Sequence, residues 1–188
     1  MKISLYLFFV TILFSSTSGF AATKNISIGL DWFINPDHAP IIIANEKNYF
    51  KEKNINVEII EPADPNDPPK LVAAGKIDIA ITYQPQFHLQ IDKNLPVIRL
   101  GSLVSTPLNC LVVLKNGNIK SIGDLKNKKI GFSVGGFEDA LLSEMLKTSG
   151  LTLSDVELIN INFSLSPSLI SKKVDAVIGA FRNFELNQ

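Results

Sequence analysis

The sequence predicts an α/β fold of two similar lobes, and three observations support this prediction. Short apolar strands alternate with helical segments along the chain, an order that is typical of a largely parallel sheet. The pattern stops at residues 115–118 and then restarts, which places a first lobe at residues 23–116 and a second at residues 117–188. The halves also resemble each other, because "LVAAGKIDIAI" and "LISKKVDAVIG" each lead from a short helix through a basic turn into a strand.

The first 22 residues have the composition of a secretory signal peptide. Lys2 precedes an apolar run over residues 5–14, and small residues then continue to Ala21 and Ala22. The apolar run is shorter than the roughly 20 residues of a membrane span, and no later stretch is long and apolar enough to be one. The sequence therefore predicts an exported, periplasmic protein without stable membrane insertion.

In the first lobe the pattern predicts five strands and three helices. Residues 26–30 alternate apolar with small or polar side chains, as a strand does, and Pro40 suits the first turn of the following helix. The prolines and aspartates of residues 61–69 predict an irregular segment. The other elements are apolar runs bounded by turn residues, with strands expected at 57–60, 77–81, 97–103 and 108–114 and helices at 39–50, 70–74 and 85–93.

The second lobe repeats this arrangement over a shorter length. Apolar residues recur on one side of a helix expected at 137–149, which indicates core packing. The remaining elements again are short apolar runs, with strands expected at 129–133, 156–161 and 174–178 and a short helix at 169–172. Ten residues follow the last expected strand, too few to close a second sheet, so we expect this lobe to be incomplete and the chain to be a truncated product or a fragment.

Charge and cysteine content exclude several function classes. The chain has 18 basic and 18 acidic residues, and removal of Lys2 leaves 17 basic residues, so the sequence gives no electrostatic basis for binding nucleic acid. Cys110 is the only cysteine, which excludes an intramolecular disulfide and a Cys-based zinc site. No cysteine stands at the expected cleavage point, as a lipid anchor would require. We expect a monomer, free in the periplasm, without a cofactor.

Two motifs suggest catalysis or metal binding but lack the partners that this chemistry needs. "GFSVG" at residues 131–135 fits the nucleophile elbow of hydrolases, yet both histidines, His38 and His88, precede Ser133, whereas an elbow requires an acid and then a histidine after it. The turn can instead bring its backbone N–H groups close to a ligand at a helix N-terminus, or it can be purely structural. The two histidines stand at no ligand spacing, so a metal site is not predicted.

Aromatic and polar residues gather where two strands are expected to end. Trp32 follows the first strand and shares its loop with Asn35 and His38, while Tyr83 and Gln84 follow another strand. Open α/β sheets bind ligands at the carboxyl ends of their strands, so these residues predict a cleft suited to a flat heterocycle. The competing interpretation is that Trp32 is a core residue, as a single Trp after a strand usually is.

Two stretches of the sequence resemble a known protein family. The stretch from "DWFINPDHAPIIIANEKNYF" to "KLVAAGKIDIAI" resembles the opening of the thiamine-pyrimidine family of periplasmic binding proteins and of their fungal relatives, the thiamine pyrimidine synthases. "SIGDLKNKKIGF" at residues 121–132 resembles the start of the second lobe in the wider family, which includes binders of sulfonates, taurine and nitrate. The resemblance implies a type II periplasmic-binding-protein fold with two lobes around a cleft.

The same resemblance implies a function and a set of ligand contacts. The protein would capture a pyrimidine precursor of thiamine and deliver it to the permease of an ABC importer, and it would not be an enzyme. Trp32 and Tyr83 would contact the ring, and the turn from Ser133 to Phe137, with Gly135 and Gly136, would face it. Glu138 and Glu185 are candidate acceptors for the ring amino group, although each also fits an exposed surface acid. His38 would lie near the cleft or orient the following helix.

Two alternative functions stay open: binding of another small molecule, such as a sulfonate, and the activity of the pyrimidine synthases. The resemblance implies that these enzymes consume one of their own histidines and bind pyridoxal phosphate through a lysine. Here Thr82 stands at the position of the lysine and Gln86 at that of the histidine, and His88 lies two residues away. A threonine cannot form a Schiff base, so the sequence favours a binding protein.

Overall fold

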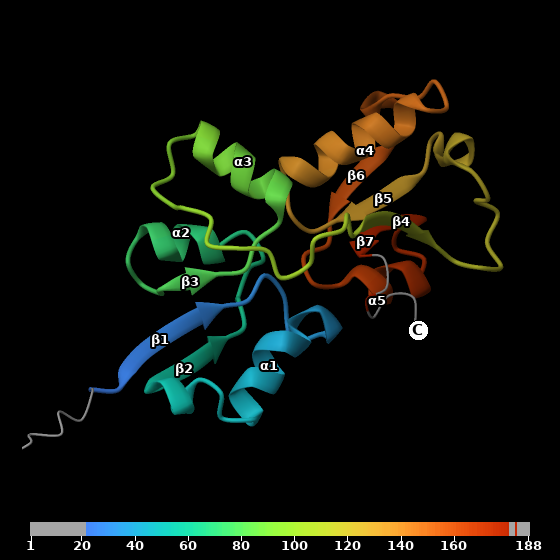
Figure 1. The fold of residues 1–188 in the computed structure, drawn as a ribbon. Helices are drawn as coiled ribbons and strands as arrows, with labels where there is room; N and C mark the ends of the chain where they lie inside the picture. Colours follow the sequence, from blue (N-terminus) through green and yellow to red (C-terminus); the bar gives the residue numbers. More distant parts are fainter. Residues whose placement is uncertain (1–21, 181–182, 184–188) are drawn as a thin grey trace, which may run out of the picture.

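Two β-sheets organise the chain in the computed structural model, which describes residues 22–180 and residue 183 (Figure 1). The first sheet has the order β2-β1-β3 and consists of β1 (Lys24–Gly29), β2 (Ile55–Ile60) and β3 (Ile79–Ala80). The second has the order β4-β7-β5-β6 and consists of β4 (Asn109–Val113), β5 (Lys129–Phe132), β6 (Glu157–Asn160) and β7 (Ala176–Ala180). All pairs are parallel except β4 with β7, so the predicted α/β class with largely parallel sheets is confirmed.

Three helices accompany the first sheet: α1 (Ala39–Glu46), α2 (Pro68–Ala73) and α3 (Gln84–Asp92). Helix α1 ends four residues earlier than predicted, and a 3-10 turn at Lys51–Lys53 leads to Asn54, whose left-handed backbone turns the chain into β2. Helix α2 begins inside the segment predicted to be irregular. Proline lacks only an N–H that the first helical turn leaves unpaired, so Pro68 and Pro69 start a helix here instead of preventing one.

The second sheet is accompanied by α4 (Phe137–Lys147) and α5 (Leu165–Ile170), together with 3-10 turns at Ile122–Leu125 and Leu153–Asp155. Helix α5 begins four residues before the short helix predicted at 169–172. Each 3-10 turn starts with a capping box, in which the carboxylate of Asp124 or Asp155 accepts the backbone N–H of Ser121 or Thr152. These caps explain why the two turns form at hydrophilic positions.

The prediction of a strand at residues 97–103 is wrong. Among the described residues this segment pairs with no strand, it bends at Leu103, and Ile98 and Leu100 are 81% and 73% exposed. An extended backbone becomes a strand only where another strand accepts and donates its hydrogen bonds. The following strand, β4, pairs with β7 of the second sheet, so the change of sheet occurs between α3 and β4 and does not coincide with the lobe boundary expected at residues 116 and 117.

Both sheets contain the same βαβαβ unit, which explains why the two halves of the sequence resemble each other. The first unit runs β1-α1-β2-α2-β3 and the second runs β5-α4-β6-α5-β7. In each unit the Asp before the third strand accepts a backbone N–H from the first strand: Asp78 from Ser27 at 2.8 Å, and Asp175 from Lys129 at 2.9 Å. The repeated Asp therefore fixes the pairing of the first and third strands in both units.

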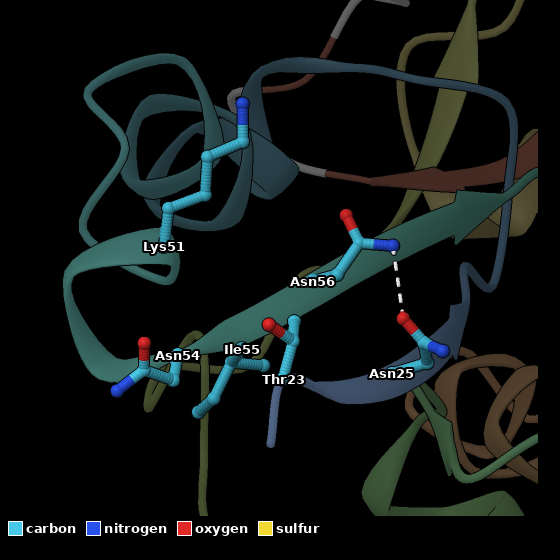
Figure 2. Close-up of a pocket in the computed structure, with 6 residues that line it drawn as sticks. All are labelled: Thr23, Asn25, Lys51, Asn54, Ile55 and Asn56. Atoms are coloured by element: carbon cyan, nitrogen blue, oxygen red, sulfur yellow. Dashed lines mark hydrogen bonds between the residues drawn. The ribbon is translucent and has the colours of Figure 1, made fainter. Parts of the chain in front are cut away.

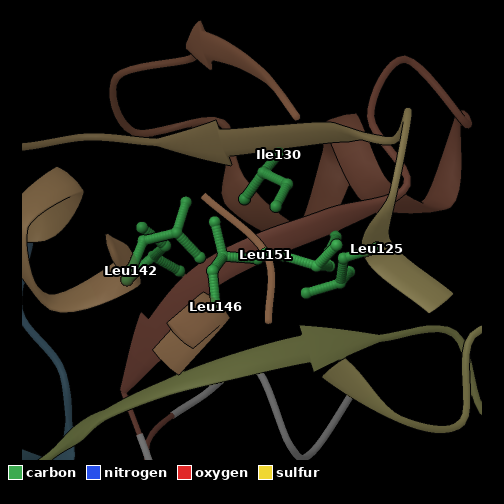
Figure 3. Close-up of a cluster of buried hydrophobic side chains, with 7 residues drawn as sticks. Leu125, Ile130, Leu142, Leu146 and Leu151 are labelled. Atoms are coloured by element: carbon green, nitrogen blue, oxygen red, sulfur yellow. The ribbon is translucent and has the colours of Figure 1, made fainter. Parts of the chain in front are cut away.

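Two hydrophobic clusters form the core around the second sheet. One contains seven buried residues between the sheet, α4 and the adjoining turns, among them Leu125, Ile130, Leu142, Leu146 and Leu151 (Figure 3). The other lies against α5 and includes Leu165, Leu169 and Val177, together with one residue from the first unit, Trp32. The first unit buries fewer apolar side chains, chiefly Ile28, Leu30 and Ile77.

Candidate functional site

A cavity of about 1270 Å³ lies between the two sheets, at the carboxyl ends of β1 and β3. Residues from both units line it, as expected for a ligand cleft of an open α/β sheet. Six of the predicted contact residues are among them: Trp32, Asn35, His38, Tyr83, Gln84 and Glu138. The residue types and the place of this cavity make it the candidate binding site.

A hydrogen-bonded chain fixes the loop that follows β1. His38 is 1% exposed, and its Nε2 lies 2.8 Å from the Oδ1 of Asp31. Its Nδ1 accepts the backbone N–H of Asn35 at 3.3 Å, so the ring proton is on Nε2 and is donated to Asp31. The side chain of Asn35 accepts the N–H of Asp37, which caps the 3-10 turn Pro36–His38 at the start of α1. His38 therefore orients the loop and helix α1 while lying beside the cavity.

Negative charge accumulates on this side of the cavity. Burial, reinforced by the neighbouring Asp31 carboxylate, raises the pKa of Asp37. Asp31 and Asp37 both line the cavity. A neutral or cationic ligand fits such a lining better than an anion does.

Trp32 combines the two roles that the sequence left open. Its side chain is 5% exposed and packs among Ile161, Leu165 and other residues of the second unit. The ring of Phe163 meets it edge-on, with centroids 4.7 Å apart and an interplanar angle of 75°. Trp32 also lines the cavity, so it is both an apolar contact between the units and part of the site wall.

Tyr83 connects the start of α3 to the start of α4. Its ring lies 5.2 Å from that of Phe137, at an interplanar angle of 30°. Tyr83 and Gln84 line the cavity, whereas the buried Phe137 packs against Tyr83 and is not part of the lining. Next to them, the Thr82 hydroxyl donates to the Oε1 of the buried Gln86 at 2.6 Å.

Glu138 is a buried carboxyl group, so its interpretation as an exposed surface acid is wrong. The side chain is 6% exposed, and its Oε2 accepts the backbone N–H groups of Ser133 at 2.8 Å and of Val134 at 3.2 Å. Burial raises the pKa of Glu138 to about 7, while the two N–H donors act in the opposite direction. Glu138 thus holds the turn before α4 and presents a titratable group to the cavity.

The turn that carries "GFSVG" is structural in its contacts. Ser133 is buried, and its hydroxyl donates to the carbonyl of Asn162 at 2.6 Å, so its proton points at a backbone carbonyl and not at a base that could activate a nucleophile. Gly136 has a φ of +93°, a conformation that favours glycine at this entry to α4. Ser133, Gly135, Gly136 and Phe137 are not among the residues that line the cavity, so a contact of this turn with ligand stays a prediction.

Two predictions lie outside the described residues: the ligand contact by Glu185, and the signal peptide, of which the structure describes Ala22 alone. Within the described ranges, no cluster of three or more His, Cys, Asp or Glu side chains could hold a metal ion. In that same part of the chain, no helix reaches the length and apolarity of a membrane span.

Part of the cavity wall consists of residues that no sequence motif marks. Residues 96–108 line it along their whole length, as do Leu141 and Met145 of α4. The positions of Leu141 and Met145, four residues apart, show that they share one helix face, but that pattern does not distinguish a cavity wall from a packed core. The sequence predicts strands inside a sheet at residues 97–103 and 108–114, so it does not indicate that residues 97–103 are exposed.

A second, smaller hollow of about 330 Å³ lies at the start of the first sheet (Figure 2). Asn25 and Asn56 are joined there by a side-chain hydrogen bond of 3.1 Å, and Thr23, Lys51, Asn54 and Ile55 complete the lining. These side chains are exposed or half-buried amides, a hydroxyl, a lysine and one isoleucine, without an aromatic wall or a carboxylate. The hollow therefore lacks the features that make the larger cavity a candidate site.

Comparison with known proteins identifies the family. Residues 35–188 match the family described as NMT1/THI5 like. The chain belongs to the NMT1/THI5-like family. A protein of Haemophilus influenzae named for thiamine biosynthesis is 60% identical over 183 residues, which are 97% of this chain and 58% of the relative.

Two further relatives carry more specific names. The formylaminopyrimidine-binding protein of Halalkalibacterium halodurans is 34% identical, over 87% of this chain and 50% of the relative. The 4-amino-5-hydroxymethyl-2-methylpyrimidine phosphate synthase of Aspergillus parasiticus is also 34% identical, over 84% of this chain and 46% of the relative. The chain thus spans about half the length of the curated relatives it matches.

Solved structures confirm the predicted fold class. The alkanesulfonate-binding protein SsuA of Xanthomonas axonopodis pv. citri superposes with a TM-score of 0.69 at 18% identity, covering 85% of this chain and 55% of that one. The periplasmic nitrate-binding protein NrtA of Synechocystis gives 0.64 at 17% identity, covering 85% and 47%. At these identities the likeness shows the fold alone, which is that of periplasmic substrate-binding proteins.

Proposed function

We propose that this chain binds a pyrimidine precursor of thiamine, such as formylaminopyrimidine or hydroxymethylpyrimidine, and serves as the periplasmic solute-binding component of an ABC importer. One observation carries the proposal: two aromatic side chains, Trp32 and Tyr83, and the buried carboxyl of Glu138 line a single cavity between the two sheets. An aminopyrimidine offers a flat face for the rings and an amino group for the carboxylate. The name of the Halalkalibacterium relative supports the choice of ligand.

The affinity expected from these contacts is modest. Stacking contributes about 1–3 kcal/mol per aromatic face, and a hydrogen bond to a charged acceptor about 1.5–3 kcal/mol. Two faces and one carboxylate give roughly 4–9 kcal/mol, whereas micromolar binding needs about 8 kcal/mol. Most of this range lies below that value, so we expect binding by this chain to be weaker than micromolar and to require contacts from both units.

Saturation-transfer NMR detects binding in this range. With each pyrimidine at about 1 mM, we expect transfer to the ring protons, reduced in a Tyr83→Ala variant and retained in a variant of the exposed Tyr49. The sulfonate MOPS serves as a comparison ligand. Transfer to MOPS without transfer to either pyrimidine would replace the proposed ligand class with a sulfonate.

A synthase activity is the second candidate, because several relatives are named pyrimidine phosphate synthases. The residues at the corresponding positions do not fit pyridoxal phosphate attached to a lysine. Thr82 has a hydroxyl that is committed to Gln86, and neither side chain can form a Schiff base. We therefore propose a binding protein, and incubation of the chain with pyridoxal phosphate should give no absorbance change at the wavelength of an internal Schiff base.

A further inference from the structure

The turn between β5 and α4 directs two successive backbone N–H groups at one acceptor. The Oε2 of Glu138 accepts the N–H of Ser133 at 2.8 Å and that of Val134 at 3.2 Å. Converging backbone N–H groups attract anions, and a turn at the carboxyl end of a parallel strand is where open α/β sheets hold ligands. Here a carboxyl group of the chain itself, which folds back from the first turn of α4, occupies the N–H pair.

Glu138 separates this N–H pair from the cavity. Ser133 and Val134 are 1% and 0% exposed and do not line the cavity, whereas Glu138 does. The carboxyl group therefore reverses the polarity of this part of the wall, because it presents an acceptor where two donors would otherwise face a ligand. The glycine-rich turn that the sequence marks as a possible anion contact is closed by its own chain.

The equivalent turn of the first unit is closed in the same way. After β1, the backbone N–H of Ile34 donates to the Oε1 of Glu61 at 2.6 Å. Glu61 follows β2, whereas Glu138 belongs to α4, so the two carboxylates reach their turns from different elements. The closure is therefore not a by-product of the repeated topology. Of the two carboxylates, Glu138 is the one that lines the cavity.

The remaining charges of the cavity wall also disfavour an anion. Among the described residues that line the cavity, Arg99 is the only lysine or arginine. Its guanidinium donates to the carbonyl of Gly101 and to the hydroxyl of Ser102. An anion that left water for this cavity would lose its hydration without gaining an uncommitted cation. Three further carboxylates line the same space: Asp31, Asp37 and Asp78.

We propose that Glu138 is a specificity-determining residue that excludes anionic ligands, because it fills the N–H pair of the β5–α4 turn with a built-in carboxyl group. The cavity then rejects sulfate, sulfonate and phosphate groups and admits neutral or cationic ligands that offer a hydrogen-bond donor. The inference rests on the proposed function only in taking this cavity as the ligand site. A phosphate ester of the same pyrimidine would be rejected as well, so phosphorylation of the ligand would have to follow its release.

The test is an NMR titration of the ¹⁵N-labelled 188-residue chain with sodium sulfate, compared with sodium chloride at equal ionic strength. At about pH 8, above the pKa of about 7, the Glu138 carboxyl is ionised. In the parent chain we expect no sulfate-specific shift of the Ser133 and Val134 amides. Glu138→Ala frees both N–H groups and should bind sulfate at least about tenfold more tightly than the parent, with shifts at these amides.

Two matched variants separate occupation of the N–H pair from the loss of a charge. Glu138→Gln removes the charge but keeps an oxygen that can accept the two N–H groups, so it should not gain sulfate binding. Asp139→Ala removes the neighbouring negative charge, which acts on Glu138, and leaves the N–H pair occupied. It should behave as the parent does. Sulfate binding by either variant as tight as that of Glu138→Ala overturns the proposal.

Thermal unfolding supplies a second measurement. Glu138→Ala leaves two buried N–H groups unpaired, so it should melt below the parent, and sulfate should raise its melting temperature more than that of the parent or of Asp139→Ala. Equal effects of sulfate on all three contradict the proposal, as does a sulfate-specific shift of the Ser133 and Val134 amides in the parent. None of these measurements uses a pyrimidine, so the proposed ligand and the role of Glu138 can fail separately.

Discussion

The two units share one topology but differ in how much apolar surface they bury. Helix α4 of the second unit buries Phe137, Leu142 and Leu146, whereas helix α1, its counterpart in the first unit, buries no residue. The sheet of the second unit also has four strands, because β4 joins it, against three in the first sheet. Topology is therefore not sufficient for a core: the first unit depends on contacts from outside itself, above all through Trp32.

Removing that contact should have the largest effect on stability. From the sequence, Trp32→Ala is expected to abolish ligand binding while leaving the fold largely intact. The burial of Trp32 among residues of the second unit changes the latter expectation, and we now predict a loss of about 3–5 kcal/mol in unfolding free energy. Urea unfolding measures it, with Phe33→Ala, at a more exposed neighbouring ring, as the milder control. A loss below about 1 kcal/mol would show that the units do not depend on Trp32.

The difference between the helices can be measured directly. Leu146→Ala in α4 should cost about 2–5 kcal/mol, because it leaves a cavity in the fully buried cluster around the second sheet. Ile43→Ala in α1 should change stability by less than about 0.5 kcal/mol, since Ile43 is half exposed. Equal effects in urea unfolding would contradict the comparison.

Glu138 should make the second unit sensitive to pH. Its pKa is raised to about 7 from 4.5, so the folded chain binds this proton more tightly than the unfolded chain does. The shifted pKa of Glu138 stabilises the folded chain fully at a pH below 4.5, the pKa in the unfolded chain. This stabilisation is lost as the pH rises toward 7, which lowers the unfolding free energy by up to about 3 kcal/mol. Glu138→Gln keeps an oxygen that can accept the N–H of Ser133 and does not titrate.

The melting temperature of the parent chain relative to Glu138→Gln should therefore fall between about pH 5 and pH 7 and remain level above that range. The comparison within one pair cancels the titration of the histidines and other acids. Parallel curves for the two proteins would show that the carboxyl group is not shielded from water.

The smallest effect is expected for the repeated aspartates. The backbone N–H of Ser27 and then its hydroxyl hold the pKa of Asp78 below its usual range, so its contribution is present at neutral pH and lost as the pH falls through that lowered value. Asp78→Asn should lower the melting temperature at neutral pH, and its difference from the parent chain should shrink as the pH falls below 3.8 and through the lowered pKa of Asp78. Asp175→Asn should do less, because Asp175 accepts the N–H of Lys129 without a second bond from a hydroxyl.

Local sequence signals predicted most of the fold because each has a local cause. Pro40 at the start of α1, the glycines before α4 and the Asp before β3 and β7 all act within a few residues. Residues 97–103 were mistaken for a strand because their apolar pattern is that of a strand, while pairing depends on a distant segment that no local pattern reports.

The candidate site was also predictable only where its cause is local in the sequence. The position of Trp32, His38 and Tyr83 at strand ends followed from the order of strands and helices, and the cavity contains all three. The burial of Glu138 did not follow, because it depends on a turn that folds back to offer two N–H groups. Nor did the edge-on packing of Trp32 against Phe163, residues separated by most of the chain.

Trp32 is the only tryptophan in the sequence, and its indole lies at the contact between the two units. The chain therefore carries an intrinsic optical reporter at that contact. Separation of the units would expose the ring to water and shift its emission to longer wavelength, whereas unfolding confined to α1 or to residues 96–108 would leave the spectrum almost unchanged. One fluorescence trace can thus distinguish opening between the units from loosening within the first.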